Sequence, residues 1–98
     1  MIFKRIVSRE NGTPWTVIGM STEQWHSIPV QEVVISELIA MQDGVFFHAL
    51  EEDYVHWHDE YPHVIVWQGE LYLEDGHHRV MKALLRGQKK VLARVLGL

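Results

Sequence analysis

The chain has 98 residues, of which 47% are apolar, and it contains no cysteine. This length and composition predict one globular α/β domain (residues 1–98) and argue against disorder. The lack of cysteine excludes a disulfide scaffold, a zinc–thiolate site, thiol catalysis and iron–sulfur ligation. Because no apolar run approaches the roughly 18 residues of a membrane-spanning helix and no signal peptide is indicated, we expect a cytoplasmic protein with no membrane partner.

The net charge of −4 is unevenly distributed along the chain. All thirteen acidic residues lie between residues 10 and 75, where there is no lysine or arginine. Residues 76–98 hold six basic residues and no acidic one. Either the acidic and basic parts pair with each other in the fold, or they form separate faces for a polyanion and for a protein partner.

The sequence pattern in the first half of the chain predicts short strands. Apolar residues at 2–7 and 15–20 flank an Asn-Gly pair, which is typical of a tight β-hairpin. Ser21 and Gln24 have the spacing of a helix capping box, so a short helical turn is expected there. A compact apolar run at 33–35 indicates a buried strand, whereas residues 38–61 have no clear periodicity.

The last third has a clearer pattern. Strands are predicted over 64–67 and 71–73 around a turn, a helix over 77–86, and a final strand over 90–96. The expected apolar stripe of the helix consists of Val80, Met81, Leu84 and Leu85. Together the elements predict an α+β fold with a small mixed sheet, one main C-terminal helix and an N-terminal hairpin.

The turn before that helix has the chemistry of an anion site. Its sequence is Asp75-Gly76-His77-His78-Arg79. The first turn of a helix has free backbone N–H groups and a positive dipole end, Gly76 permits close approach, and Arg79 adds a forked cation. Alternatively, Asp75 only caps the helix, Gly76 only turns the chain and Arg79 only pairs with a nearby acid.

This turn, with the helix and strand that follow it, resembles the "DGHHR" box of the ParB/sulfiredoxin superfamily. An upstream Ile28-Pro29-Val30 and the segment 39–42 are similar to other parts of small, phage-type ParB-like proteins. The resemblance covers residues 28–96, which would be the family core, and leaves the hairpin at 1–20 as an extension.

The resemblance implies that Asp75, Gly76, His77, His78 and Arg79 hold nucleotide phosphate. It also implies that Gln42 lies at the site and that a magnesium-bound nucleotide is a candidate cofactor. His77, His78 and Glu37 are the candidate catalytic residues, although no general base is clear. Sulfiredoxin activity is excluded because it needs a cysteine.

The middle of the chain offers two further hypotheses. His56 and His58 would lie on one face of a strand and are weak metal-ligand candidates, but a solvated loop fits as well. Tyr54, Trp57 and Tyr61 are candidate interface anchors beside five acidic residues between 51 and 60. The alternative is that these aromatic side chains cover the sheet while the acids stay in water.

Two classes of function follow from these patterns. The first is a ParB-like phage or bacterial effector that binds a host protein or a second copy of itself and retains the phosphate-binding turn. The second is a nucleotide-dependent enzyme, such as an NTPase, phosphotransferase or nuclease, that uses the box. Nucleic acid is the less favoured partner because the net charge is negative.

Overall fold

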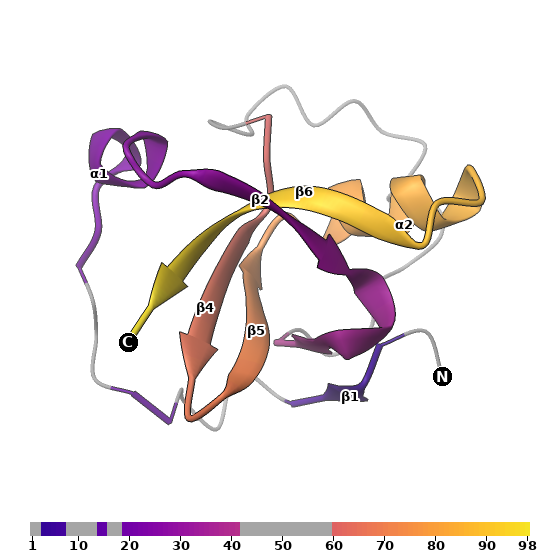
Figure 1. The fold of residues 1–98 in the computed structure, drawn as a ribbon, viewed down its shortest axis with the longest axis horizontal. Coiled ribbons are helices and arrows are strands. Elements are labelled where there is room, and N and C mark those ends of the chain that lie inside the picture. Colours follow the sequence, from indigo (N-terminus) through magenta and orange to yellow (C-terminus); the bar gives the residue numbers. More distant parts are fainter. Residues whose placement is uncertain (1–2, 8–13, 16–18, 42–59) are drawn as a thin grey trace.

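The computed structural model describes residues 3–7, 14–15, 19–41 and 60–98. Within these residues the chain forms a six-stranded mixed sheet with two α-helices and a short 3-10 helix (Figure 1). The elements in chain order are β1 (Arg5–Ile6), α1 (Thr22–His26), β2 (Val30–Val34), η2 (Ile35–Glu37), β3 (Leu38–Ala40), β4 (His63–Trp67), β5 (Glu70–Asp75), α2 (His77–Leu85) and β6 (Lys90–Gly97).

The predicted class, a small α+β fold with a mixed sheet and a main C-terminal helix, is confirmed. A specific ParB/sulfiredoxin-like fold is not. The N-terminal hairpin stays a prediction, because residues 8–13 and 16–18 lie outside the described residues. Strand β1 pairs in parallel with β3, with Arg5 opposite Ile39.

The sheet is strongly curled, and the reason lies in its connectivity. Its strand order is β1-β3-β5-β4-β6-β2, so β2 and β3 are four strand positions apart. In a flat sheet that separation is about 19 Å. Only the three residues of η2 connect the two strands, and the four steps from Val34 to Leu38 span at most about 14 Å. The far strands must therefore approach each other, as the path of β2 across the other strands in Figure 1 shows.

A two-residue turn joins β4 to β5. Gln68 and Gly69 have φ angles of 49° and 76°, and Trp67 pairs with Glu70 across the turn. Positive φ at both central residues is the geometry that matches the right-handed twist of adjacent strands. This turn fixes the register of the β4–β5 pair.

The alternation of side chains along the strands produces two apolar clusters. Leu38 and Ala40 of β3 and Leu73 of β5 belong to the main core, while Ile39 and Tyr72 belong to a second cluster. Neighbouring residues of one strand point to opposite faces, so both faces of the sheet are covered. On the second face, the rings of Trp15 and Trp67 lie 5.0 and 6.3 Å from that of Tyr72.

Helix α2 contributes Val80, Met81 and Ala83 to the main core. The predicted stripe also contained Leu84, which is partly buried against this core, and Leu85, which is 62% exposed. The prediction was wrong for Leu85. Leu85 lies four residues after the buried Met81, on the same helix face, but it is the last residue of the helix and is left exposed at that end.

The predicted capping box at the start of α1 is confirmed. The Ser21 hydroxyl accepts a hydrogen bond from the backbone N–H of Gln24, and the Gln24 side chain accepts one from the backbone N–H of Ser21. The helix presents buried Trp25, whose ring stacks on the imidazole of His63 at the start of β4 with 4.2 Å between centroids. Helix α1 is thereby held against the sheet. Among the described residues, no helix is long and apolar enough to cross a membrane.

Strand β1 is attached to the sheet by charge as well as by its backbone. Glu70 accepts hydrogen bonds from Lys4 at 3.2 Å and from Arg5 at 2.6 Å. The hydrogen bond from Lys4 is the largest effect that lowers the pKa of the Glu70 carboxyl; desolvation opposes it, and the charges of Arg5 and Lys4 lower it further. The ionised form of Glu70 is therefore favoured by the fold.

We predict that Glu70→Gln removes a small, pH-dependent part of the stability. The pKa of Glu70 is lower in the folded chain than its usual value of 4.5. The stabilisation is therefore present above that usual value and is lost as the pH falls through the folded pKa. Urea unfolding at several pH values should show a gap between wild type and variant at pH 7 that closes in acid and in high salt. The control is Glu37→Gln, at an exposed residue; equal pH profiles for Glu70→Gln and wild type would contradict the prediction.

Candidate functional site

The predicted turn lies where β4 begins, β5 ends and α2 starts. Gly76 is the N-cap residue of α2 and has a left-handed conformation with φ 89°. A Cβ at Gly76 would lie 2.8 Å from the Cα atom of Pro62. The Asp75 carboxylate accepts a hydrogen bond from the Gly76 N–H at 2.9 Å. Both the backbone angle and the close approach require glycine here.

His77 is a structural residue in this geometry. Its side chain is 4% exposed, and its Nε2 atom accepts a hydrogen bond from the backbone N–H of Met41 at 3.0 Å. The bond joins the first residue of α2 to the residue that follows β3. Because Nε2 is occupied, that nitrogen is not available to donate to a phosphate or to act as a base. His78, the next residue, is half-buried and lines a hollow beside the helix.

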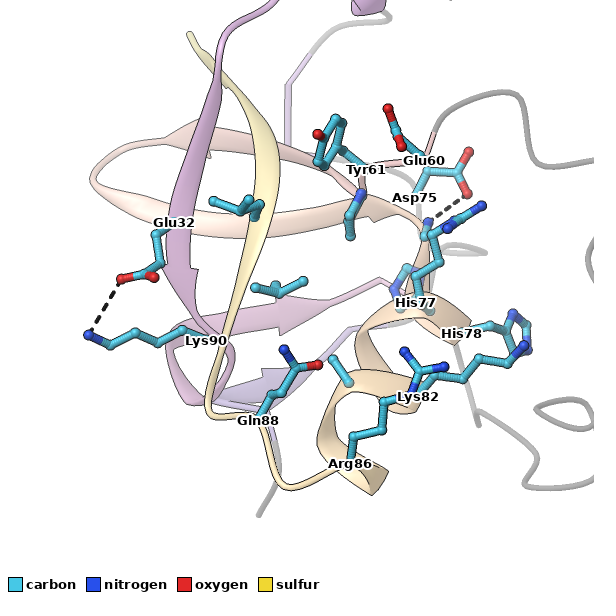
Figure 2. A pocket seen from close by; sticks show the side chains of 16 residues that line it. Glu32, Glu60, Tyr61, Asp75, His77, His78, Lys82, Arg86, Gln88 and Lys90 are labelled. Carbon is cyan, nitrogen blue, oxygen red and sulfur yellow. Dashed lines mark hydrogen bonds and ion pairs between the residues drawn. The ribbon is translucent and has the colours of Figure 1, made fainter.

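A hollow of about 720 Å³ runs along α2 and β6 (Figure 2). Its lining comes from the junction before β4, from the end of β5, from α2, from the first residues of β6 and from Glu32 of β2. Pro62, Ala83 and Val91 give it apolar surface, and Leu92, which is 48% exposed, adds more. Concave surfaces that combine apolar area with a few polar groups are typical binding sites.

One wall of the hollow is cationic. Arg79, Lys82 and Arg86 of the α2 segment all line it. Their spacing of three and four residues places them on one face of the helix. None of the three forms an ion pair with another described residue. We call this row the basic stripe.

The facing wall has its charges paired. Lys90 of β6 and Glu32 of β2 form an ion pair at 3.5 Å, as Figure 2 shows. Glu60 and Asp75 add acidic groups at the junction end of the hollow. Among the described residues that line the hollow, the cations without an ion pair therefore lie on the helix side.

The structure separates several of the predicted site residues. Glu37 lines a different hollow, of about 410 Å³, together with Val66, Leu71 and Val95, and so is not brought to the box. Tyr61 lies in the α2–β6 hollow, where the Arg94 guanidinium is 5.2 Å from its ring. The remaining predicted residues, Gln42, Tyr54, His56, Trp57 and His58, lie outside the described residues.

No group of three or more potential metal ligands occurs among residues 3–7, 14–15, 19–41 and 60–98. The metal candidates at 56 and 58 are untested by this observation. His63, which the sequence places near them, is 8% exposed and stacks on Trp25.

The site residues predicted from the sequence lie mainly in the box and include few of the other residues that line the hollow. Lys82, Arg86 and Leu92 were not among the predicted site residues. The spacing of Arg79, Lys82 and Arg86 was a usable signal, because it places three cations on one helix face. No local sequence pattern predicts that Leu92 and Pro62 line the hollow, because their positions depend on strand pairing.

A comparison with known families gives a match over the whole chain. A model of the family described as "Antitoxin VapB-like" matches residues 1–98. No curated protein and no solved structure gives a significant match. The match overturns the ParB/sulfiredoxin resemblance, and with it the expected functions of a phosphate-binding ParB-like effector or a nucleotide-dependent enzyme. The box-like sequence was specific over only a few residues, and local glycine-turn chemistry of this kind occurs in unrelated folds.

We predict that Gly76→Ala destabilises the chain more than Gly87→Ala does. Both glycines have positive φ, 89° and 83°, but an added Cβ meets nothing within 4 Å at Gly87. The backbone strain alone should cost about 1–2 kcal/mol in each variant. The clash with Pro62 should add about 1–3 kcal/mol for Gly76→Ala. Chemical unfolding measures the difference, and equal losses would show that the close approach carries no energy.

We also predict that His77→Leu and His78→Leu differ sharply. The first substitution leaves the buried Met41 N–H without its acceptor and should cost about 1–3 kcal/mol in the free energy of unfolding. The second changes a half-buried side chain at the hollow and should cost clearly less. Urea titrations of both variants provide the measurement. If His77→Leu is as stable as wild type, the hydrogen bond to Met41 does not hold the helix.

Proposed function

Since the chain belongs to the VapB-like antitoxin family, we propose that it is an antitoxin, which neutralises a toxin protein by binding to it. The observation that carries this proposal is the family match over residues 1–98. An antitoxin needs a surface that binds a protein and needs no catalytic constellation of its own. The expected protein partner is then a toxin, rather than a nucleotide-bearing ligand.

We infer that the α2–β6 hollow forms part of the toxin-binding surface. In its favour are its volume of about 720 Å³ and its position between a helix and a strand that share the main core. Protein interfaces combine an apolar centre with a polar rim. Val91 and Leu92 provide apolar contact area, and the basic stripe with the Glu32–Lys90 pair provides the rim.

The hollow is also separable from the elements that keep the chain folded. Leu92 is 48% exposed and Arg79 and Arg86 are exposed, whereas the core residues of the same elements, such as Val80 and Ala93, are fully buried. Substitutions at these exposed positions are therefore expected to affect binding without removing core contacts. This separation makes the proposal testable by mutation.

We predict that co-expression of the chain with its toxin restores growth and that the two proteins copurify. Leu92→Ser should weaken the complex about tenfold or more, because it removes apolar area from the centre of the interface. The control is Leu98→Ser, since Leu98 is 56% exposed and does not line the hollow. Growth assays and calorimetry on the purified pair provide the measurements. If wild-type chain neither restores growth nor binds the toxin, the antitoxin proposal is wrong; if both variants bind equally, only the position of the surface is wrong.

A further inference from the structure

We propose that the basic stripe, Arg79, Lys82 and Arg86, receives an acidic segment of the toxin protein, with its carboxylates spaced along the helix axis. This inference rests on the proposed antitoxin function and specifies the chemistry of the partner at the hollow. It concerns the helix wall of the hollow, where the described structure leaves positive charge without a counter-charge.

The cations of the stripe differ from most other cations of the described residues, which have a partner. Lys4 and Arg5 pair with Glu70, and Lys90 pairs with Glu32. Arg94 donates to the Ile28 carbonyl at 2.7 Å. Arg79, Lys82 and Arg86, by contrast, form no ion pair with a described residue, and all three line the hollow.

The stripe is unfavourable for the isolated helix. Residues 76–86 contain no acid, so α2 has none of the oppositely charged pairs three or four residues apart that stabilise solvated helices. Like charges at those spacings repel each other. Arg79 lies in the first turn of α2, where the helix dipole disfavours a cation and which itself contains no acidic residue. An acidic partner would relieve both effects on binding.

The surface beside the stripe is partly apolar. The hollow brings Pro62, Val91 and Leu92 next to the cations. Apolar contacts can supply affinity, while the charges orient the partner and accelerate encounter. Small counter-ions from the solvent would need no such apolar surface. A protein segment that carries both apolar and acidic side chains fits this combination.

The geometry specifies the spacing of the acids in the partner. From residue 79 to residue 86 the helix rises about 10.5 Å. An antiparallel helix would match it with acids at positions i, i+3 or i+4, and i+7. An extended segment would match it with acids on alternate residues, about 6.7 Å apart. Arginine at both ends of the stripe can bind a carboxylate through two parallel hydrogen bonds.

The test measures the affinity of the toxin for the chain by calorimetry, with the charge of the stripe reversed. The triple variant Arg79→Glu/Lys82→Glu/Arg86→Glu should bind at least about 100-fold more weakly at low salt. The matched control is Lys89→Glu, because Lys89 is exposed, does not line the hollow and makes no ion pair with a described residue; it should change the affinity less than about threefold. Far-UV circular dichroism and thermal unfolding establish that both variants are folded.

Salt gives an independent readout. The wild-type affinity should fall as the ionic strength rises to about 1 M, where the screening length is roughly 3 Å, whereas the affinity of the triple variant should rise, because salt screens the repulsion that charge reversal creates. Charge reversal with unchanged toxin affinity and unchanged salt dependence would overturn the inference while leaving the antitoxin proposal intact. Absence of any complex with the wild-type chain would overturn both. Binding of a DNA duplex that depends on the stripe, together with toxin binding that does not, would assign the stripe to nucleic acid and would also overturn the inference.

Discussion

The close approach between Gly76 and Pro62 is the constraint on which the arrangement of the C-terminal half depends. A Cβ at residue 76 would lie 2.8 Å from the Pro62 Cα atom, and the φ angle there is 89°. Only glycine fits both this distance and this backbone angle. At this point the start of β4 and the end of β5 come together, and α2 departs from them. The contact holds the N-terminus of α2 beside Pro62, and both Gly76 and Pro62 line the hollow.

Two other connections make that contact consistent with the rest of the fold. The hydrogen bond from the Met41 N–H to His77 Nε2 links the first turn of α2 to the end of β3. The short η2 connection forces the sheet to curl, so Val33 of β2, Leu38 of β3 and Ala93 of β6 share one core with Val80 of α2. The helix thus belongs to the same core as the sheet. Arg79 and Lys82 lie outside this core, whereas Ala83 belongs to it and also lines the hollow.

The sequence predicted those elements whose signals are local. The capping box of α1, the β4–β5 hairpin and α2 each carry their own residue pattern, so their positions were predicted to within a few residues. The parallel pairing of β1 with β3 and the curl of the sheet arise from contacts between residues far apart in the chain, and no local pattern contains them. At the turn 75–79 the local position was predicted correctly, but the role of one side chain was not. Its residues were placed correctly at a helix start, yet the burial of His77, which gives that side chain a structural role, depends on the distant Met41.

Local patterns also gave a wrong family resemblance, although they did predict a cationic helix start at Arg79. A glycine turn that feeds a helix with histidine and arginine is a local solution to entering a helix from a strand, so it carries little family information. The distribution of charge carries more. The chain has a net charge of −4, yet its last 23 residues hold six cations and no acid. Of these six, Lys90 is paired with Glu32 and Arg94 is bonded to the Ile28 carbonyl. The three cations of the stripe lie outside the main core, with Arg79 and Arg86 exposed and Lys82 half-buried, and their like charges repel one another. A negative chain that retains such a stripe beside an apolar hollow has the charge asymmetry expected for recognition of a partner protein rather than for stability.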